Sequence, residues 1–273
     1  TILLAVTLAV GSTSAGWISG LRSTPRLSPA PTLYVDPSPS IEPSQLPSVT
    51  PGPVLSFATW NIAKPTNTAV PKWGKRRLAM ARTINQSLAD VIALQEADNV
   101  AVTGEGGKRM TAWEDVQALA AEGGYVAPHV DVSTCGSGCV HSAHILYRSS
   151  TISEVELPNG EPCACQGELR DIASGLHYAK RREFSWAFLQ GANGSGPFLA
   201  ISVHTNNQTN SVGKRDHARV GAGLNAWAEA KVKKSGLGTV PMILMGDFNS
   251  YRSEEHTSEL QSLRHLVCRL LLE

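Results

Sequence analysis

The chain has 273 residues, of which 42% are hydrophobic and 17% are charged, and its formal net charge is +1 at pH 7. This length accommodates one large domain or two small ones, and the hydrophobic fraction is that of a globular protein. The near-zero net charge argues against a protein dedicated to nucleic acid or anionic membranes, because such proteins carry a strong excess of basic residues.

The N-terminus carries the features of an export signal. Residues 1–22 begin with about ten apolar residues (TILLAVTLAV) and continue with small residues. A membrane span needs roughly 20 apolar residues, whereas the apolar part of a signal peptide is shorter. We interpret residues 1–22 as part of a signal peptide or of a short N-terminal anchor, in a sequence that starts inside its gene. Residues 23–53 are rich in Pro and Ser and predict an extended linker, so we expect a secreted or cell-surface protein.

Four of the five cysteines fall in one region, namely Cys135, Cys139, Cys163 and Cys165. An even set of cysteines in an exported protein favours disulfides, although the sequence does not fix their pairing. A competing interpretation is a zinc site, because His141 and His144 closely follow Cys139, but their spacing matches no common zinc template well.

Hydrophobic periodicity predicts an alternation of strands and helices from residue 54 onward. We expect helices over 75–88, 112–122 and 215–233, and strands over 54–62, 90–94, 144–148, 184–190, 198–204 and 240–245. In the first helix, the apolar residues at helical spacing are Leu78, Ala81, Ile84 and Leu88.

Polar residues close four of these apolar strands. They are Asn61, Glu96, His204 and the pair Asp247 and Asn249. A polar residue at the end of a buried strand is where a scaffold presents chemistry to solvent. Each of them alone is weak evidence, because a single Glu after a strand is more often a solvated loop residue.

The order of the four segments is more specific. TWNI, DVIALQE, SVH and GDFN, which occur in this order between residues 54 and 250, resemble the signature of the endonuclease/exonuclease/phosphatase superfamily. The resemblance implies an α+β fold, a four-layer αββα sandwich of two mixed β-sheets flanked by helices, over residues 54–251. It also implies a phosphoesterase that uses Mg²⁺, with Mn²⁺ or Ca²⁺ as alternatives, to hydrolyse phosphate esters by metal-assisted attack of water.

The same resemblance implies a role for each site residue. Glu96 would be the main magnesium ligand and Asn61 would add an amide oxygen, since Mg²⁺ prefers oxygen ligands. Asp247 would orient or deprotonate the attacking water, and Asn249 and His204 would hydrogen-bond the phosphate. One further residue, Arg182 in KRREF, matches a basic position near the phosphate in some nuclease-like members.

The C-terminal tail does not fit the family. The resemblance implies a later Asp-His pair, but no Asp follows Asp247. Residues 252–273 can be read as a translated sequencing adapter, on both sides of a short index, and we interpret them as artefactual. The alternative is an amphipathic helix, because Leu260, Leu263 and Leu266 have helical spacing. We therefore expect a domain that is incomplete at its C-terminus, and a chain that is inactive as written.

The substrate class stays open at this point. Nucleic acid, phospholipid and sugar phosphate are all compatible with the resemblance, although the near-neutral charge disfavours strong affinity for nucleic acid. We expect a monomer without an obligate protein partner. The alternative from another class is a non-catalytic binding module that retains the fold, and a zinc-binding module around Cys135–Cys165 is a third.

Overall fold

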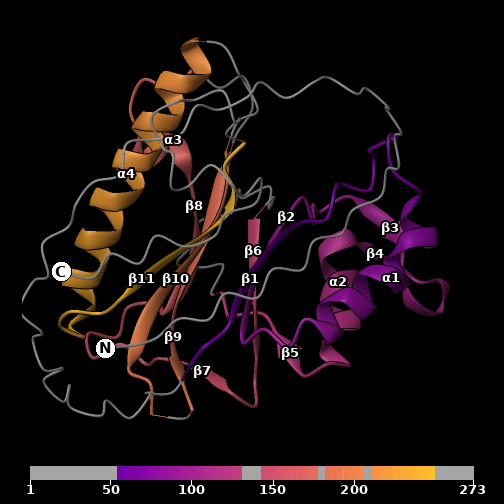
Figure 1. The fold of residues 1–273 in the computed structure, drawn as a ribbon, viewed down its shortest axis with the longest axis horizontal. Coiled ribbons are helices and arrows are strands. Elements are labelled where there is room, and N and C mark those ends of the chain that lie inside the picture. Colours follow the sequence, from indigo (N-terminus) through magenta and orange to yellow (C-terminus); the bar gives the residue numbers. More distant parts are fainter. Residues whose placement is uncertain (1–53, 131–142, 178–181, 193, 206–210, 250–273) are drawn as a thin grey trace, which may run out of the picture.

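The computed structural model describes residues 54–130, 143–177, 182–192, 194–205 and 211–249. In this part, two β-sheets face each other and helices cover the outer side of each sheet (Figure 1). The predicted export segment, the linker, the tail, Cys135 and Cys139 lie outside these residues. None of the described helices is both long enough and apolar enough to cross a membrane.

The first sheet has the strand order β1-β2-β6-β5. Strand β1 (Phe57–Asn61) runs parallel to β2 (Val91–Gln95), and β6 (Ala143–Arg148) pairs antiparallel with both β2 and the short β5 (Tyr125–Val126). The sheet is therefore mixed.

The second sheet has the strand order β11-β10-β9-β7, and β8 also pairs with β9. Its strands are β7 (Ile152–Glu154), β8 (Ala164–Glu168), β9 (Glu183–Gly191), β10 (Pro197–His204) and β11 (Met242–Asp247). Strand β10 runs parallel to β11 and antiparallel to β9, so this sheet is mixed as well.

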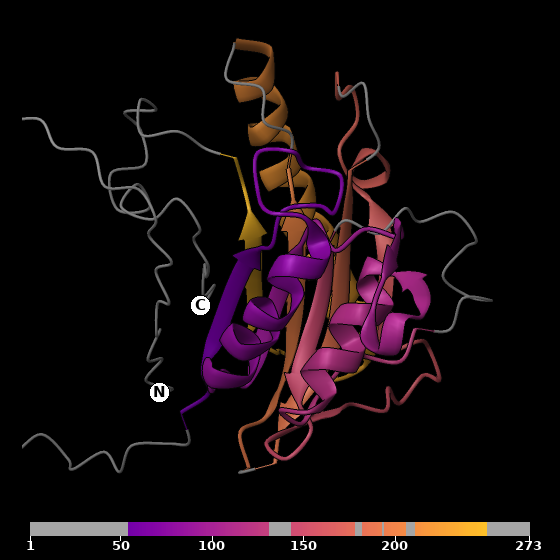
Figure 2. The same cartoon turned by 90° about the vertical axis from the view of Figure 1, so that its right-hand side faces the viewer.

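Two helices cover the first sheet and two cover the second. Helices α1 (Trp73–Gln86) and α2 (Ala112–Ala121) pack on the first sheet, and α4 (Ser211–Ser235) packs on the second beside the short α3 (Leu169–Ile172). Figure 1 shows the two sheets edge-on between these helical layers, and in Figure 2 helices α1 and α2 lie in front of the first sheet.

Alternation of side chains along the strands produces the layers. In β2, Val91 and Ala93 belong to the apolar cluster between the two sheets, whereas Ile92 and Leu94 pack under α1 and α2. Strand β10 alternates in the same way between the inner cluster and the cluster under α4. The described residues thus form the predicted four-layer αββα sandwich.

The predicted apolar face of α1 is partly wrong. Ala81 and Ile84 are buried as expected, but Leu78 is 54% exposed and Leu88 is 72% exposed. The buried stripe runs instead through Trp73 and Met80 to Ile84. Trp73 was outside the predicted helix, which began at residue 75, and Leu88 lies beyond the helix end with a φ of 55°. Misplaced helix ends therefore account for the errors at Trp73 and Leu88, whereas Leu78 lies within the helix on its exposed side.

The longer elements were predicted to within a few residues, but several short ones were missed. These are α3, a 3₁₀ turn at Glu105–Gly107, the strands β5, β7 and β8, and the hairpin of β3 (Ala101–Thr103) and β4 (Arg109–Thr111). Each is two to five residues long. A segment that short contains too few residues for a hydrophobic period to be recognised.

Candidate active site

The two parallel strand pairs bring the predicted site residues to one end of the sandwich. Asn61 ends β1 beside Gln95 of β2, and His204 ends β10 beside Asp247 of β11. Strands β1 and β11 contact each other across the two sheets and point the same way (Figure 2). Residues that come from two sheets and lie far apart in the sequence therefore meet in one place.

Asn61 lies at the centre of this group. Its Nδ2 donates to Glu96 Oε1 at 3.1 Å and to Asp247 Oδ2 at 2.8 Å. Its Oδ1 accepts from the backbone N–H of Ala63 at 2.9 Å. One neutral amide thus bridges two carboxylates, one from each sheet.

Glu96 is held in an unusual backbone conformation. Its φ is 67°, in the left-handed region that non-glycine residues seldom adopt, and its Oε2 accepts from the backbone N–H of Lys64 at 2.7 Å. Ala63 and Asn249 also have positive φ values, of 57° and 49°. Three of the four non-glycine residues with positive φ in the described ranges thus lie in the loops of this group. Such strained positions cluster at functional sites, where the surroundings hold them in place.

His204 is buried between the carboxylates and a guanidinium. Its Nε2 lies 3.8 Å from Glu96 Oε1 and 3.9 Å from Asp247 Oδ2, and Arg182 Nη1 lies 3.2 Å from its Nδ1. Burial and the positive charge of Arg182 lower the pKa of His204 to about 4, against the opposing effect of the carboxylates. The imidazole is therefore neutral at pH 7. Arg182 Nη1 also lies 3.4 Å from its Nε2.

Asn249 is fixed by the backbone that surrounds it. Its N–H donates to Asp247 Oδ1 at 2.9 Å, and its Nδ2 donates to the carbonyl of Thr205 at 2.9 Å. An amide nitrogen carries two N–H donors, and this carbonyl takes one of them. The role of Asn249 in phosphate binding that the resemblance implies stays a prediction.

Sequence reasoning missed one acidic residue of the group. Burial and the nearby charge of Glu96 raise the pKa of Asp98 to about 6, against Lys64 and Arg182, which lower it. The segment Glu96-Ala97-Asp98 places two carboxylates two residues apart, and this spacing was the available signal. Because Lys64 and Arg182 lower the pKa of Asp98, their positive charges lie near the carboxylates of this group.

Residues 58–267 match the model of the endonuclease/exonuclease/phosphatase family. The chain belongs to this family. The match contains all the predicted site residues and extends beyond the predicted domain end at residue 251. Members of the family are hydrolases that act on phosphate esters, and they generally use divalent metal ions. No curated protein matches the chain.

Solved structures share the fold. A family protein from Bacteroides thetaiotaomicron is 20% identical with a TM-score of 0.50, and the match covers 74% of this chain and 65% of that one. A functionally unknown protein from Enterococcus faecalis V583 is 19% identical (TM-score 0.51, 73% and 68% covered). A family protein from Bacteroides vulgatus is 15% identical (TM-score 0.51, 75% and 70% covered). The chain thus spans slightly less than two thirds of the B. thetaiotaomicron protein, and these identities support the fold alone.

The two carboxylates of the group fit a divalent cation, but the orientation of the Asn61 amide differs from the prediction. Two carboxylate oxygens, Glu96 Oε1 and Asp247 Oδ2, converge on the single amide nitrogen of Asn61. Mg²⁺ is typically bound by one or two carboxylates and keeps several waters, so this donor set fits it. Within the described ranges, however, no three His, Cys, Asp or Glu side chains gather into a metal cage. The predicted amide-oxygen ligand is turned away in this structure, because the oxygen of Asn61 accepts from Ala63.

The cysteine region differs in part from the prediction. Cys165 is in a disulfide whose partner lies outside the described residues. Cys163 is a free thiol that donates to Glu154 Oε2 at 3.2 Å, and burial together with Glu154 raises its pKa to about 11. The expectation of a disulfide at Cys163 is therefore wrong for this structure. The half-buried carboxylate of Glu154 is the hydrogen-bond partner of the Cys163 thiol.

His144, one of the two histidines considered for a zinc site, makes structural contacts inside the fold. It is buried, stacks on Trp113 with ring centroids 3.8 Å apart, and its Nε2 lies 2.9 Å from the carbonyl of Ala97. It thereby contacts the loop that follows Glu96. The structure gives the zinc alternative no support at this residue.

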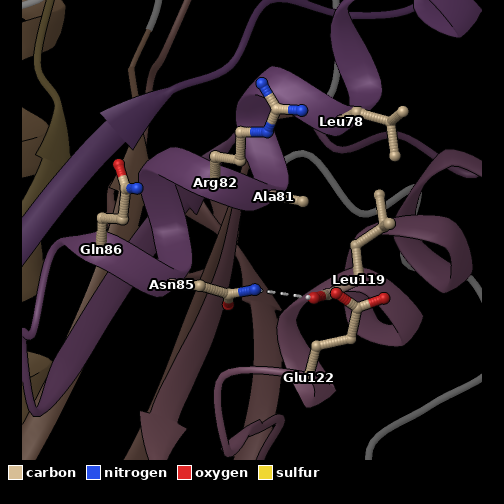
Figure 3. A pocket seen from close by; sticks show the side chains of 7 residues that line it. All are labelled: Leu78, Ala81, Arg82, Asn85, Gln86, Leu119 and Glu122. Carbon is tan, nitrogen blue, oxygen red and sulfur yellow. Dashed lines mark hydrogen bonds between the residues drawn. The ribbon is translucent and has the colours of Figure 1, made fainter.

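A shallow pocket lies away from the strand ends, between α1 and α2 (Figure 3). It has a volume of about 230 Å³ and is lined by side chains of these helices and Glu122. Within it, Asn85 Nδ2 donates to the carbonyl of Leu119 at 3.2 Å. None of the predicted site residues lines this pocket, so it is not part of the candidate active site.

Proposed function

We propose that the strand-end group is a Mg²⁺-dependent phosphoesterase site, with Glu96 as the main metal ligand. The observation that carries this proposal is the convergence of Glu96 and Asp247, from two different sheets, on the amide nitrogen of Asn61. The hydrogen bonds that these two carboxylates accept from described residues come from neutral amides, and a divalent cation would bind their oxygens directly.

Each remaining residue of the group has a chemical task in this proposal. Asp247 would orient the attacking water or accept a proton from it. It would use Oδ2, which accepts a hydrogen bond from Asn61 in this structure. Asn249 and the neutral His204 would donate hydrogen bonds to phosphate oxygens as charge develops on them. Arg182 would add positive charge on the same side. Mg²⁺, when bound, would polarise the phosphoryl oxygen and stabilise the leaving group.

The substrate would be a phosphate ester of modest size. A net charge of +1 supplies little long-range attraction for a polyanion, so tight binding of long nucleic acid is disfavoured. A phospholipid or a sugar phosphate is compatible with an exported protein. We also propose export, because the N-terminal segment has signal-like features and Cys165 is in a disulfide, which persists in oxidising compartments.

Metal binding is the first test, because it needs only residues that the chain contains. We expect calorimetry to show saturable Mg²⁺ binding to the 273-residue chain that is lost in Glu96→Ala. Because no Asp-His pair follows Asp247, we expect the chain as written not to hydrolyse bis-p-nitrophenyl phosphate with Mg²⁺. Equal Mg²⁺ binding by Glu96→Ala, or hydrolysis that proceeds in EDTA, would contradict the proposal.

A further inference from the structure

Two adjacent arginines of α1 make different kinds of contact. Arg76 reaches the loop that follows β1, where its Nη1 donates to the carbonyl of Ile62 and its Nη2 donates to the carbonyls of Ala63 and Lys64. Arg77 instead reaches α2, where it hydrogen-bonds both carboxylate oxygens of Asp115. One guanidinium therefore holds three consecutive backbone carbonyls, and the other holds one carboxylate.

The loop whose carbonyls accept from Arg76 also donates backbone hydrogen bonds to the site residues Asn61 and Glu96. The N–H of Ala63 donates to Asn61 Oδ1 at 2.9 Å, and the N–H of Lys64 donates to Glu96 Oε2 at 2.7 Å. Ala63 has a φ of 57°, a conformation that costs free energy for a residue with a Cβ. The hydrogen bonds from Arg76 to the neighbouring carbonyls provide a reason for this conformation to persist.

The geometry makes a continuous chain of contacts from α1 to the carboxylate. The guanidinium is fixed on a regular helix, the carbonyls of the loop face it, and two N–H groups of the same loop face Asn61 and Glu96. A planar group with five N–H donors can hold several acceptors at once, which a single ammonium cannot match. Arg76 thus reaches Glu96 through the loop, in addition to the electrostatic attraction between the two side chains.

We propose that Arg76 is a positioning residue of the candidate metal site, acting through the backbone of residues 62–64 to orient Glu96 and Asn61. This inference rests on the proposed function for its effect on Mg²⁺, but its effect on the loop is independent of any metal. Arg77 provides a matched control, because it is an adjacent arginine of the same helix whose contacts lie on α2.

The first experiment measures amide hydrogen exchange at Ala63 and Lys64 without metal. In the wild-type chain both amides are hydrogen-bonded, so we expect protection from exchange. Arg76→Met should accelerate exchange of both amides by about tenfold or more, since about 1.4 kcal/mol of lost local stability corresponds to that factor. Arg77→Met should leave the exchange of these two amides close to that of the wild type.

The second experiment measures Mg²⁺ affinity by calorimetry. Residues that orient metal ligands typically contribute 10- to 100-fold in affinity, so we expect the Kd of Arg76→Met to rise by about that factor. Arg76→Lys keeps the charge but replaces the two donor nitrogens, Nη1 and Nη2, with a single one, and should give an intermediate Kd. Arg77→Met should change the Kd by less than about twofold, even if it lowers the melting temperature more.

The outcomes separate this inference from the proposed function. If a folded Arg76→Met variant shows unchanged exchange at Ala63 and Lys64, or an unchanged Mg²⁺ Kd, the inference is overturned. If Arg76→Met does not fold, the same comparisons are made on Arg76→Lys. If the wild-type chain binds no Mg²⁺, the proposed function fails. Amide exchange then still decides whether Arg76 orders the loop.

Discussion

The strand-end group and the interface between α1 and α2 both contain buried carboxylates, but they balance charge differently. At the interface, Asp115 is fully buried and accepts hydrogen bonds from Trp73 Nε1 and from two nitrogens of Arg77. At the strand ends, Glu96 and Asp247 share one neutral amide nitrogen. Asp115 is compensated by a direct ion pair with Arg77, whereas the hydrogen bonds that Glu96 and Asp247 accept from described residues come from neutral amides, with Lys64 and Arg182 as charges nearby. We infer that the direct ion pair marks a structural contact here and that two converging carboxylates held by neutral amides mark a place for a cation.

The largest expected effect on metal affinity comes from Glu96→Gln. The change keeps the shape of the side chain but removes one of the two carboxylates, so we expect the Mg²⁺ Kd to rise by about 100-fold or more. The free energy of unfolding without metal should change by less than about 1 kcal/mol, because Glu96 is partly exposed and accepts its hydrogen bonds from neutral amides. Calorimetry and urea denaturation measure the two quantities.

Glu122→Gln is the control for this variant, because Glu122 is an exposed carboxylate beside the pocket between α1 and α2. It should leave Mg²⁺ binding unchanged. Similar losses of affinity in both variants would show that general electrostatics, rather than the strand-end geometry, attracts the metal.

A smaller effect on affinity is expected from Gln95→Met. Buried Gln95 accepts from Thr59 Oγ1 at 3.2 Å and donates to Ser202 Oγ of the other sheet at 3.3 Å, next to the site. Removing it leaves two hydroxyls without this partner, which should cost about 1–3 kcal/mol of unfolding free energy. Because Gln95 does not contact the carboxylates in the described structure, Mg²⁺ affinity should fall by less than about tenfold. The exposed Gln190→Met should change neither quantity, and a Gln95→Met variant as stable as the wild type would refute the inter-sheet contact.

Asp115→Asn should have no effect on Mg²⁺ affinity and a large effect on stability. Breaking a buried ion pair by removing one partner typically costs about 3–5 kcal/mol, because the other charge is left buried. Burial by itself would raise the pKa of Asp115, but the hydrogen bonds from Arg77 and Trp73 outweigh it and leave the pKa below its usual range. Urea denaturation and calorimetry on one preparation measure both effects.

The lowered pKa fixes the sign of the pH dependence. A carboxylate with a depressed pKa contributes stability that is present above its unfolded pKa of about 3.9 and is lost as pH falls through the lower folded value. The stability difference between the wild type and Asp115→Asn should therefore be constant from pH 7 to 5 and shrink below about pH 4. A difference that stays constant at low pH would count against the ion pair.

The sequence was sufficient for the parts of the site that depend on local pattern. Glu96 and Asp247 follow short apolar runs, so their place at strand ends could be predicted, and the order of the motifs indicated the family. The structure also brings Arg182 to His204, a contact that the motif, which suggested only a basic residue near the phosphate, did not specify. The chemical roles of these residues stay predictions.

Contacts between distant segments could not be predicted from local pattern. Arg76 is one of several basic residues in KWGKRR, and no periodicity separates it from Arg77. The contact between Gln95 and Ser202 joins residues 107 positions apart. The inward turn of the Asn61 nitrogen also depends on the loop conformation at Ala63, which a single sequence does not specify. The prediction of a disulfide at Cys163 was wrong for a similar reason, since its thiol hydrogen-bonds the carboxylate of Glu154 instead.

The central claim is that residues from both sheets form one metal site. The most direct test replaces Mg²⁺ with paramagnetic Mn²⁺ and records nuclear magnetic resonance spectra of the full chain. The account predicts that substoichiometric Mn²⁺ broadens the amide signals of residues 61–64, 96–98, 204–205 and 247–249 together. The signals of residues 233–235, at the far end of α4, should persist. Broadening of only one sheet's residues, or equal broadening of residues 233–235, would contradict it.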